Sequence, residues 1–170
     1  MPGIANTPFR TVIVRVLAVT AVPLAAMLAG VGPAAAQANG PVSNARSGLC
    51  VDTNGDPGVV NTGLLVRDCG DLPGQAWTFD PASGRLSNVN SGLCVDTNGD
   101  PGVANTALLL RSCTDNAGQF WTYDGATARF TNLHSGLCVD TAGDPAAANT
   151  ALVLRTCGTG TGQLWTVPAA

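Results

Sequence analysis

Short apolar runs separated by turn-forming residues recur along the chain with a fixed period. The first four runs lie at 49–51, 64–67, 77–79 and 85–87, and the stretch 54–58 (Asn-Gly-Asp-Pro-Gly) follows the first of them. All four runs return 44 residues later, and three of them return once more after another 44. Brief apolar runs bounded by Gly, Pro, Asn and Asp predict β-strands and leave no room for a long helix. The pattern therefore predicts an all-β chain of three 44-residue repeats with four strands each.

Three markers keep the repeats in register. The heptapeptide Ser-Gly-Leu-Cys-Val-Asp-Thr begins at Ser47, Ser91 and Ser135, and Gln-x-Trp begins at Gln75, Gln119 and Gln163. Repeat one runs over 44–87, repeat two over 88–131 and repeat three from 132 to the end, with no linker between them. Repeat three stops before its fourth strand. The segment 41–43, which aligns with 85–87, is a candidate to supply that strand and close a ring.

One shared core is expected, because each repeat is too small to bury its own apolar face. A closed arrangement also removes the free sheet edges on which strands aggregate. The aromatic positions that follow each Gln-x predict the centre of this core, and they are Trp77, Trp121 and Trp165 with their neighbours Phe79, Tyr123 and Val167.

Residues 1–36 have a composition of their own. Arg10 and Arg15 precede an apolar run over 16–31, and Ala34-Ala35-Ala36 follows. This order predicts a secretory signal peptide cleaved after Ala36 or Ala38, with 37–43 as a short flexible lead-in. The alternative is an uncleaved membrane anchor, which the Pro and Gly residues inside the run disfavour. A secreted, extracellular protein is expected, and Arg without Lys together with high Ala and Gly indicates a bacterial source.

Charge excludes several partners for the mature part. It holds six Arg and eleven Asp, with no Lys or Glu, which gives a net charge of 6 − 11 = −5. Nucleic acid and anionic membranes require clustered basic residues, so neither is an expected partner after signal cleavage. No cofactor is expected.

All six Cys lie in the repeats, and each repeat holds two of them 19 residues apart. Six Cys allow fifteen pairings in principle. The threefold repeat makes three equivalent bridges the simplest solution, and these are Cys50–Cys69, Cys94–Cys113 and Cys138–Cys157. Such bridges fit an oxidising, secreted context. A zinc site is not expected, because the Cys are not closely paired and the single His is His134.

The repeats resemble the ricin-type β-trefoil lectin domain, and the resemblance covers residues 44–167. It rests on Gly-Leu-Cys-Val-Asp, the second Cys and Gln-x-Trp, all present three times. The resemblance implies a β-trefoil domain over 44–170, with twelve short strands and pseudo-threefold symmetry, six strands forming a barrel and six a hairpin cap. It also implies reversible binding of carbohydrate, a glycan or polysaccharide, at up to one shallow site per repeat.

The family's site residues carry over only in part. Its hydroxyl-binding Asp is present as Asp52, Asp96 and Asp140, and the Gln of Gln-x-Trp as Gln75, Gln119 and Gln163. The family's stacking aromatic is replaced by Arg67, Arg111 and Arg155, and its polar residue four before the second Cys by Leu65, Leu109 and Val153. The Asn that often precedes Gln-x-Trp is Gly74, Gly118 and Gly162.

Two hypotheses explain the Arg residues. In one, each Arg forms a bidentate pair with the Asp of its repeat and fills the pocket. In the other, the Arg contacts a ligand such as an acidic sugar.

Other patterns favour structure over chemistry. The stretch Asp52 to Asp56 resembles the start of a calcium loop, but Pro57 stands where such a loop needs Gly, so a turn is expected. Asn61-Thr62 and its two copies predict turns, with a contact to ligand at the site rim as the alternative. The Gln of Gln-x-Trp is expected to hydrogen-bond to backbone groups and hold them together.

An enzyme is not expected. The alternative to a lectin is a protein-interaction module or protease inhibitor on the same fold.

Overall fold

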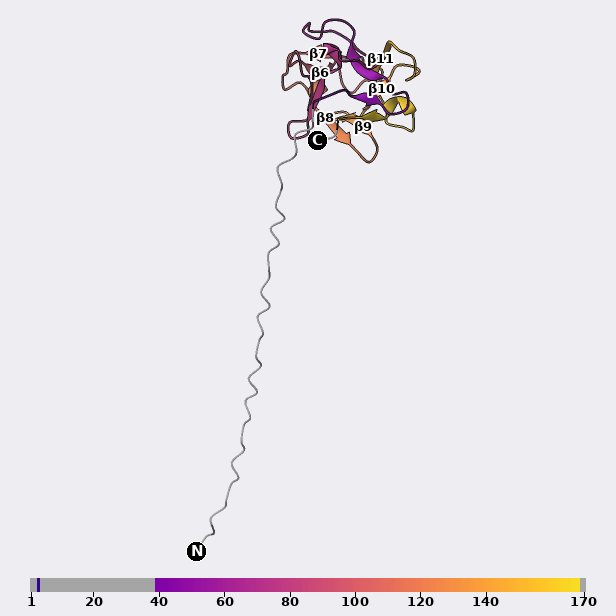
Figure 1. Cartoon of the computed structure of the whole chain (residues 1–170). Helices are drawn as coiled ribbons and strands as arrows, with labels where there is room; N and C mark the ends of the chain where they lie inside the picture. The colour runs from indigo at the N-terminus through magenta and orange to yellow at the C-terminus, as the bar shows by residue number, and fades with distance from the viewer. Residues whose placement is uncertain (1–2, 4–38, 169–170) are drawn as a thin grey trace. The chain divides into compact units, whose positions relative to one another are not determined.

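The computed structural model describes Gly3 and residues 39–168 (Figure 1). All of its strands belong to the unit Pro33–Ala170. The predicted signal peptide, residues 1–36, lies outside the described residues apart from Gly3, as do the two predicted cleavage points. Among the residues described, no helix is both long enough and apolar enough to cross a membrane.

Twelve short strands and three 3-10 turns form the folded unit. In repeat one and just before it, they are β1 (Ser43–Asn44), β2 (Cys50–Thr53), β3 (Leu64–Arg67), η1 (Pro73–Gln75), β4 (Trp77–Asp80) and β5 (Arg85–Asn88). Repeat two gives β6 (Cys94–Thr97), β7 (Leu108–Arg111), η2 (Ala117–Gln119), β8 (Trp121–Asp124) and β9 (Arg129–Asn132). Repeat three gives β10 (Cys138–Thr141), β11 (Thr150–Arg155), η3 (Thr161–Gln163) and β12 (Trp165–Thr166).

The strands pair as antiparallel hairpins that repeat three times. The β2–β3, β6–β7 and β10–β11 hairpins share one register, in which the heptapeptide Asp faces Leu65, Leu109 or Val153. The strand orders are β12-β1-β2-β3-β11-β10-β9-β8 and β4-β5-β6-β7. The β6–β7 and β10–β11 hairpins lie in the upper part of the folded unit in Figure 1, above β8 and β9. The fold is a β-trefoil, as predicted.

The N-terminal segment closes the ring. Ser43 pairs with Thr166 of β12, so the segment ahead of repeat one does supply the missing fourth strand. Gly40, which precedes this strand in the chain, accepts a hydrogen bond of 2.9 Å from Trp77 N at its carbonyl oxygen. Gly84 and Ala128 accept the same bond from the next Trp along the chain, at 2.8 and 2.7 Å. Residues 40–43 are therefore part of the trefoil, and the prediction that they form a flexible lead-in was wrong.

All three Trp belong to the hydrophobic core. Trp77, Trp121 and Trp165 are each 1% exposed, and each indole N–H donates to the carbonyl of the Val in its repeat's heptapeptide, Val51, Val95 or Val139, over 2.9–3.1 Å. A buried indole N–H needs such a partner. Phe79 is buried as predicted, but Tyr123 and Val167 only pack against the edge of the core. Tyr123 stays half-buried because its hydroxyl donates to Trp165 O over 2.9 Å.

Three disulfides anchor the repeats. They join Cys50 to Cys69, Cys94 to Cys113 and Cys138 to Cys157, which confirms the predicted pairing. Each closes a loop of about 20 residues, and the chain-entropy model assigns such a loop roughly 3 kcal/mol of stabilisation.

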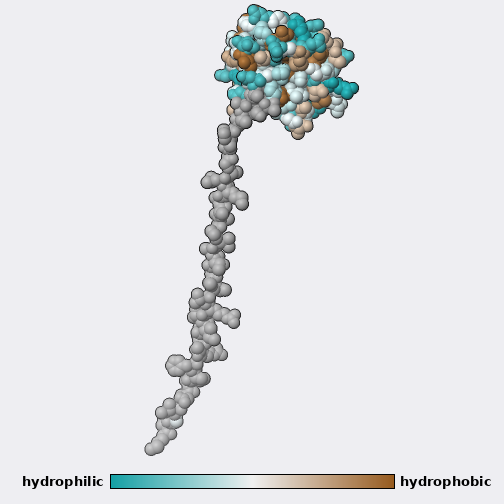
Figure 2. All heavy atoms as spheres, viewed as in Figure 1, coloured by the Kyte–Doolittle hydropathy of each residue, from teal (hydrophilic) through white to brown (hydrophobic). Residues whose placement is uncertain are grey.

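On the face of the folded unit seen in Figure 2, hydrophilic and hydrophobic residues are interspersed.

Candidate functional site

The heptapeptide Asp is a buried residue in every repeat. Asp52, Asp96 and Asp140 are 3%, 0% and 8% exposed, and each is the third residue of its strand. In the first two repeats, one carboxylate oxygen accepts a hydrogen bond of 2.7 Å from the next backbone N–H, that of Thr53 or Thr97. Charge-assisted bonds of this kind stabilise a buried carboxylate. The strand thus fixes the Asp before any ligand arrives.

The Gln of Gln-x-Trp holds the other carboxylate oxygen. Gln75 Nε2 donates to Asp52 Oδ2 over 3.0 Å and also to the carbonyl of Asp68 over 2.9 Å. Its own oxygen accepts from Gly70 N over 2.8 Å. Gln119 and Gln163 make the same three bonds. The side chain does tie backbone together, as predicted, and in doing so it also orients the Asp.

The Arg that replaces the family's aromatic lies beside this pair. Arg67 Nη1 is 3.8 Å from Asp52 Oδ2, and the equivalent distances are 3.7 Å at Arg111 and 3.8 Å at Arg155. These distances are too long for a hydrogen bond. The bidentate Asp–Arg pair proposed from the sequence is therefore absent. The two charges face each other, but the carboxylate is bound by Gln and backbone instead.

Other acceptors hold each guanidinium. Arg67 Nη1 donates to Thr53 O over 3.4 Å, and Nη2 donates to the side-chain oxygen of Asn54 over 3.3 Å. Arg111 has the same partners in its own repeat. In repeat three Ala142 stands where the Asn should be, and Arg155 Nη2 donates to its backbone carbonyl over 3.1 Å. The guanidinium keeps its position even where that acceptor side chain is lost.

Each Arg also bonds to a neighbouring repeat. Arg67 Nε donates to the side-chain oxygen of Asn149, and Arg111 and Arg155 donate in the same way to Asn61 and Asn105. The three Asn have φ of 66–67°, the left-handed conformation that Asn tolerates better than most residues. The predicted turn at Asn-Thr is confirmed. Sequence reasoning missed the bond from Asn to Arg, for which the recurrence of both residues in every repeat was the only signal.

Glycine before each Gln lets the 3-10 turn pack directly on the Asp. A Cβ built at Gly74 would overlap the Asp52 carboxylate and the Thr53 hydroxyl, and Gly118 and Gly162 meet the same two groups in their repeats. A larger residue at this position cannot coexist with the present Asp conformation. Glycine in place of the family's Asn is therefore part of how this chain holds its carboxylate.

The stretch that resembles a calcium loop is a turn. Thr53 donates its hydroxyl to Gly55 O over 2.7 Å, and Asp56 accepts from Gly58 N over 2.8 Å. The Asp56 side chain thus organises the local backbone, as Asp commonly does in turns. Among residues 39–168 no group of three or more His, Cys, Asp or Glu could hold a metal ion.

An open depression of ≈350 Å³ lies over the candidate site of repeat two. Asp96, Arg111 and Gln119 line it together with Val60 and Asn61 from repeat one. The Arg111 side chain is 34% exposed, whereas that of Asp96 is 1% exposed. The structure therefore brings all three predicted residue types together, with Arg as the most accessible of them. Leu109, in place of the family's polar residue, is buried.

A family model described as the ricin-type beta-trefoil lectin domain matches residues 38–165. A search among curated proteins found no sequence that matches. Three similar solved structures illustrate the range of structural relatives. ThreeFoil, a designed threefold-symmetric protein, has a TM-score of 0.71 and 16% identity, covering 78% of this chain and 99% of that one.

The other two structures are natural lectins. The hemolytic lectin CEL-III has a TM-score of 0.67 and 25% identity over 78% of this chain and 30% of that one. The C-terminal half of an earthworm R-type lectin, solved with GalNAc, has a TM-score of 0.65 and 13% identity, covering 78% of this chain and 98% of that one. At 16% and 13% identity, the first and third likenesses concern the fold alone.

Proposed function

Because the chain belongs to the ricin-type β-trefoil lectin domain family, we propose that it is a secreted carbohydrate-binding protein with up to three repeat-related shallow sugar sites. One observation carries the proposal. In every repeat an Asp, a Gln and an Arg come together with an Asn from a neighbouring repeat, in the same geometry.

Sugar hydroxyls can both donate and accept hydrogen bonds, which suits a site with fixed donors and acceptors. The Arg offers its exposed edge, and several bonds already hold it, so little side-chain entropy is lost on binding. Because each guanidinium faces a carboxylate, the site has no excess positive charge to attract an acidic sugar. Neutral glycans are therefore the expected ligands.

Affinity at one site is expected to be low. Each neutral hydrogen bond contributes about 0.5–1.5 kcal/mol net, and the candidate site has no aromatic to add apolar contact. Three equivalent sites on one domain compensate through avidity when the ligand is a polysaccharide. The proposed role is binding and not catalysis, since the carboxylates of the site are held by Gln and backbone.

Secretion is proposed from two features. The first 36 residues have the order of a signal peptide, and the three disulfides suit an oxidising compartment. Expression of the full chain with its own N-terminus, followed by mass measurement of the exported product, tests this directly. A product that begins at residue 37 or 39 supports the proposal, and an unprocessed product retained in the cell contradicts it.

A glycan array carrying neutral and acidic glycans tests the binding function. The mature domain is compared with Arg67/Arg111/Arg155→Gln, which removes the guanidinium but leaves the bonds between Asp and Gln in place. Binding to neutral glycans that the triple variant loses supports the proposal. Binding that the triple variant retains puts the sugar elsewhere on the domain, and no binding to any glycan favours a protein-interaction role.

A further inference from the structure

Repeat two departs from the threefold symmetry beside Gln119, at Phe120 and His134. Phe120 stands where the other repeats have Ala76 and Leu164. His134, the only histidine of the chain, stands at a position that also varies between the repeats. Within residues 39–168 the other aromatic residues are confined to the core and its edge, so a half-buried Phe outside it requires an explanation.

An open depression of ≈310 Å³ lies at this place, lined by Asp115, Ala117, Phe120, Leu133 and His134. Leu133 is 64% exposed and Phe120 is half-buried, so both side chains are accessible to a ligand. The lining thus combines the apolar side chains of Ala117, Phe120 and Leu133 with one carboxylate and one imidazole. Small-molecule sites typically combine an apolar, aromatic lining with a few polar groups that fix orientation.

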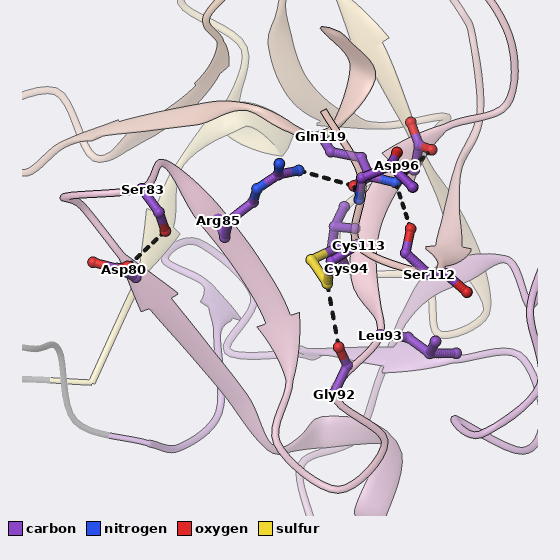
Figure 3. Close-up of a disulfide and its surroundings, with 12 residues drawn as sticks. Asp80, Ser83, Arg85, Gly92, Leu93, Cys94, Asp96, Ser112, Cys113 and Gln119 are labelled. Atoms are coloured by element: carbon purple, nitrogen blue, oxygen red, sulfur yellow. Dashed lines mark hydrogen bonds between the residues drawn. A yellow bond between two sulfur atoms is a disulfide. The ribbon is translucent and has the colours of Figure 1, made fainter. Parts of the chain in front are cut away.

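Arg85 packs on the aromatic ring and pairs with the carboxylate of Asp115, whose side chain is fully exposed. Its guanidinium carbon lies 4.1 Å from the centroid of the Phe120 ring, and Nη2 lies 3.3 Å from Asp115 Oδ1. Nη1 donates to the Gln119 side-chain oxygen over 2.8 Å, the contact drawn in Figure 3. The Arg85 side chain is only 17% exposed, and it does not line the depression. Asp115 Oδ2 makes no hydrogen bond to the residues described and is free to accept one.

The other two repeats lack this combination. The corresponding depression of repeat one is lined by Ala76 and Asn90 in place of Phe120 and His134, and Pro41 occupies the position of Arg85. In repeat three, Leu164 replaces the Phe and Thr159 replaces the Asp. The aromatic, the carboxylate, the imidazole and the supporting Arg therefore occur together only once.

We propose that this depression binds one pyranose ring of a neutral glycan. The apolar C–H face of the ring packs on Phe120 and Leu133, and its hydroxyls bond to Asp115 and His134. A pyranose matches a lining of apolar and polar side chains, because one face of its ring is apolar and its edge carries hydroxyls. The exposed Asp115 carboxylate disfavours an anionic ligand. This site supplies the aromatic contact that the three Asp–Arg sites lack, and it does not depend on them.

NMR on the mature domain tests the proposal, because a single histidine gives one assignable set of imidazole C–H signals. The probes are the methyl glycosides of galactose, glucose, mannose, xylose and N-acetylglucosamine, each titrated separately. At least one is expected to shift the His134 signals saturably. Phe120→Ala, which installs the side chain of repeat one, is expected to weaken that binding by about tenfold, as loss of an aromatic contact predicts. Leu164→Ala, the matched change in repeat three, is expected to leave it unchanged.

Two results would overturn the proposal: no saturable shift with any of the five glycosides, or a shift that Phe120→Ala leaves at its original affinity. Arg67/Arg111/Arg155→Gln separates this site from the Asp–Arg sites. If Phe120→Ala loses the His134 shift but still binds a neutral glycan on the array, and adding Arg67/Arg111/Arg155→Gln removes that remaining binding, both proposals stand. If only the His134 response is missing, the Phe120 site alone is refuted.

Discussion

Arg67 donates from Nε to the side-chain oxygen of Asn149 over 2.8 Å, although the two residues are 82 positions apart. The same bond joins Arg111 to Asn61 and Arg155 to Asn105. Repeat three thus supports the candidate site of repeat one, repeat one that of repeat two, and repeat two that of repeat three. The three sites form a closed ring, and no single repeat contains a complete one.

Removing one Asn side chain is expected to loosen the ring without unfolding it. Asn149→Gly keeps the left-handed backbone at φ 67° and deletes the acceptor for Arg67, so the free energy of unfolding should fall by about 0.5–1.5 kcal/mol. Asn149→Ala should cost about 1–2 kcal/mol more, because it adds the strain of a Cβ in that conformation. Urea unfolding measures both. Equal stability of the two variants would show that the backbone has left the observed conformation.

Replacing the glycine before Gln-x-Trp is expected to destabilise the fold. In Gly118→Ala the new methyl would overlap the Asp96 carboxylate and the Thr97 hydroxyl, so we expect a loss of about 1–3 kcal/mol, as in other overpacked sites. Gly125→Ala is the matched control, since its nearest atom is 3.9 Å away in Tyr123, and it should change stability by less than about 0.5 kcal/mol. Thermal unfolding compares them. Equal melting temperatures would argue against direct packing of the 3-10 turn on the Asp.

The repeat made most of the fold predictable. Three identical Cys spacings made the intra-repeat pairing the simplest symmetric solution, and it is the one found. The alternation around Trp77 placed both Trp77 and Phe79 in the core, where they are found. The sequence predicted that 41–43 supplies the missing strand, but it did not predict that the trefoil includes Gly40, because a single Gly carries no strand pattern. The role of Gly40 becomes visible only when it is aligned with Gly84 and Ala128, which accept the same bond from Trp121 and Trp165.

The sequence predicted which Asp, Gln and Arg residues form the candidate site, but it did not predict the hydrogen bonds between them. Sequence spacing brings Asp52 and Arg67 together because they lie on paired strands. The spacing does not predict that the Asp52 carboxylate is hydrogen-bonded by Gln75 and by a backbone N–H. Nor does it predict that the Arg67 guanidinium donates to Thr53, Asn54 and Asn149 instead of to Asp52. Such competition between acceptors depends on ångström-scale geometry and on residues of another repeat, which no local pattern specifies.

Two exposed turns are expected to make stability depend on pH in acid. The pKa of Asp80 lies below its ordinary value of 3.8, chiefly because the Ser83 hydroxyl donates to it and next because the backbone N–H of Ala82 does. Thr127 and Ala126 act in the same way on the pKa of Asp124. A carboxyl with a lowered folded-state pKa stabilises the fold above its unfolded-state pKa. That contribution is lost as the pH falls through the folded-state pKa.

Ser83→Ala with Thr127→Ala should therefore reduce the acid dependence. The urea midpoint, followed from about pH 5 to about pH 2, should fall less steeply in the double variant than in the wild-type domain. Ser112→Ala, whose hydroxyl has no carboxylate partner among the residues described, is the control and should follow the wild type. A double variant that loses stability as steeply as the wild type would assign the acid sensitivity to other carboxylates.

The most direct test of the Asp–Arg sites is an NMR titration that observes the side-chain amides of Gln75, Gln119 and Gln163. Each of these amides donates to the Asp of its repeat over 2.9–3.0 Å, so it reports any new bond formed at that carboxylate or at the adjacent Arg. The titrant is the neutral glycan that gives the strongest array signal. We predict that at least one of the three Gln amide signals shifts saturably, and that Arg67/Arg111/Arg155→Gln abolishes the shift. A glycan that binds while all three amide signals stay fixed would contradict the proposed sites.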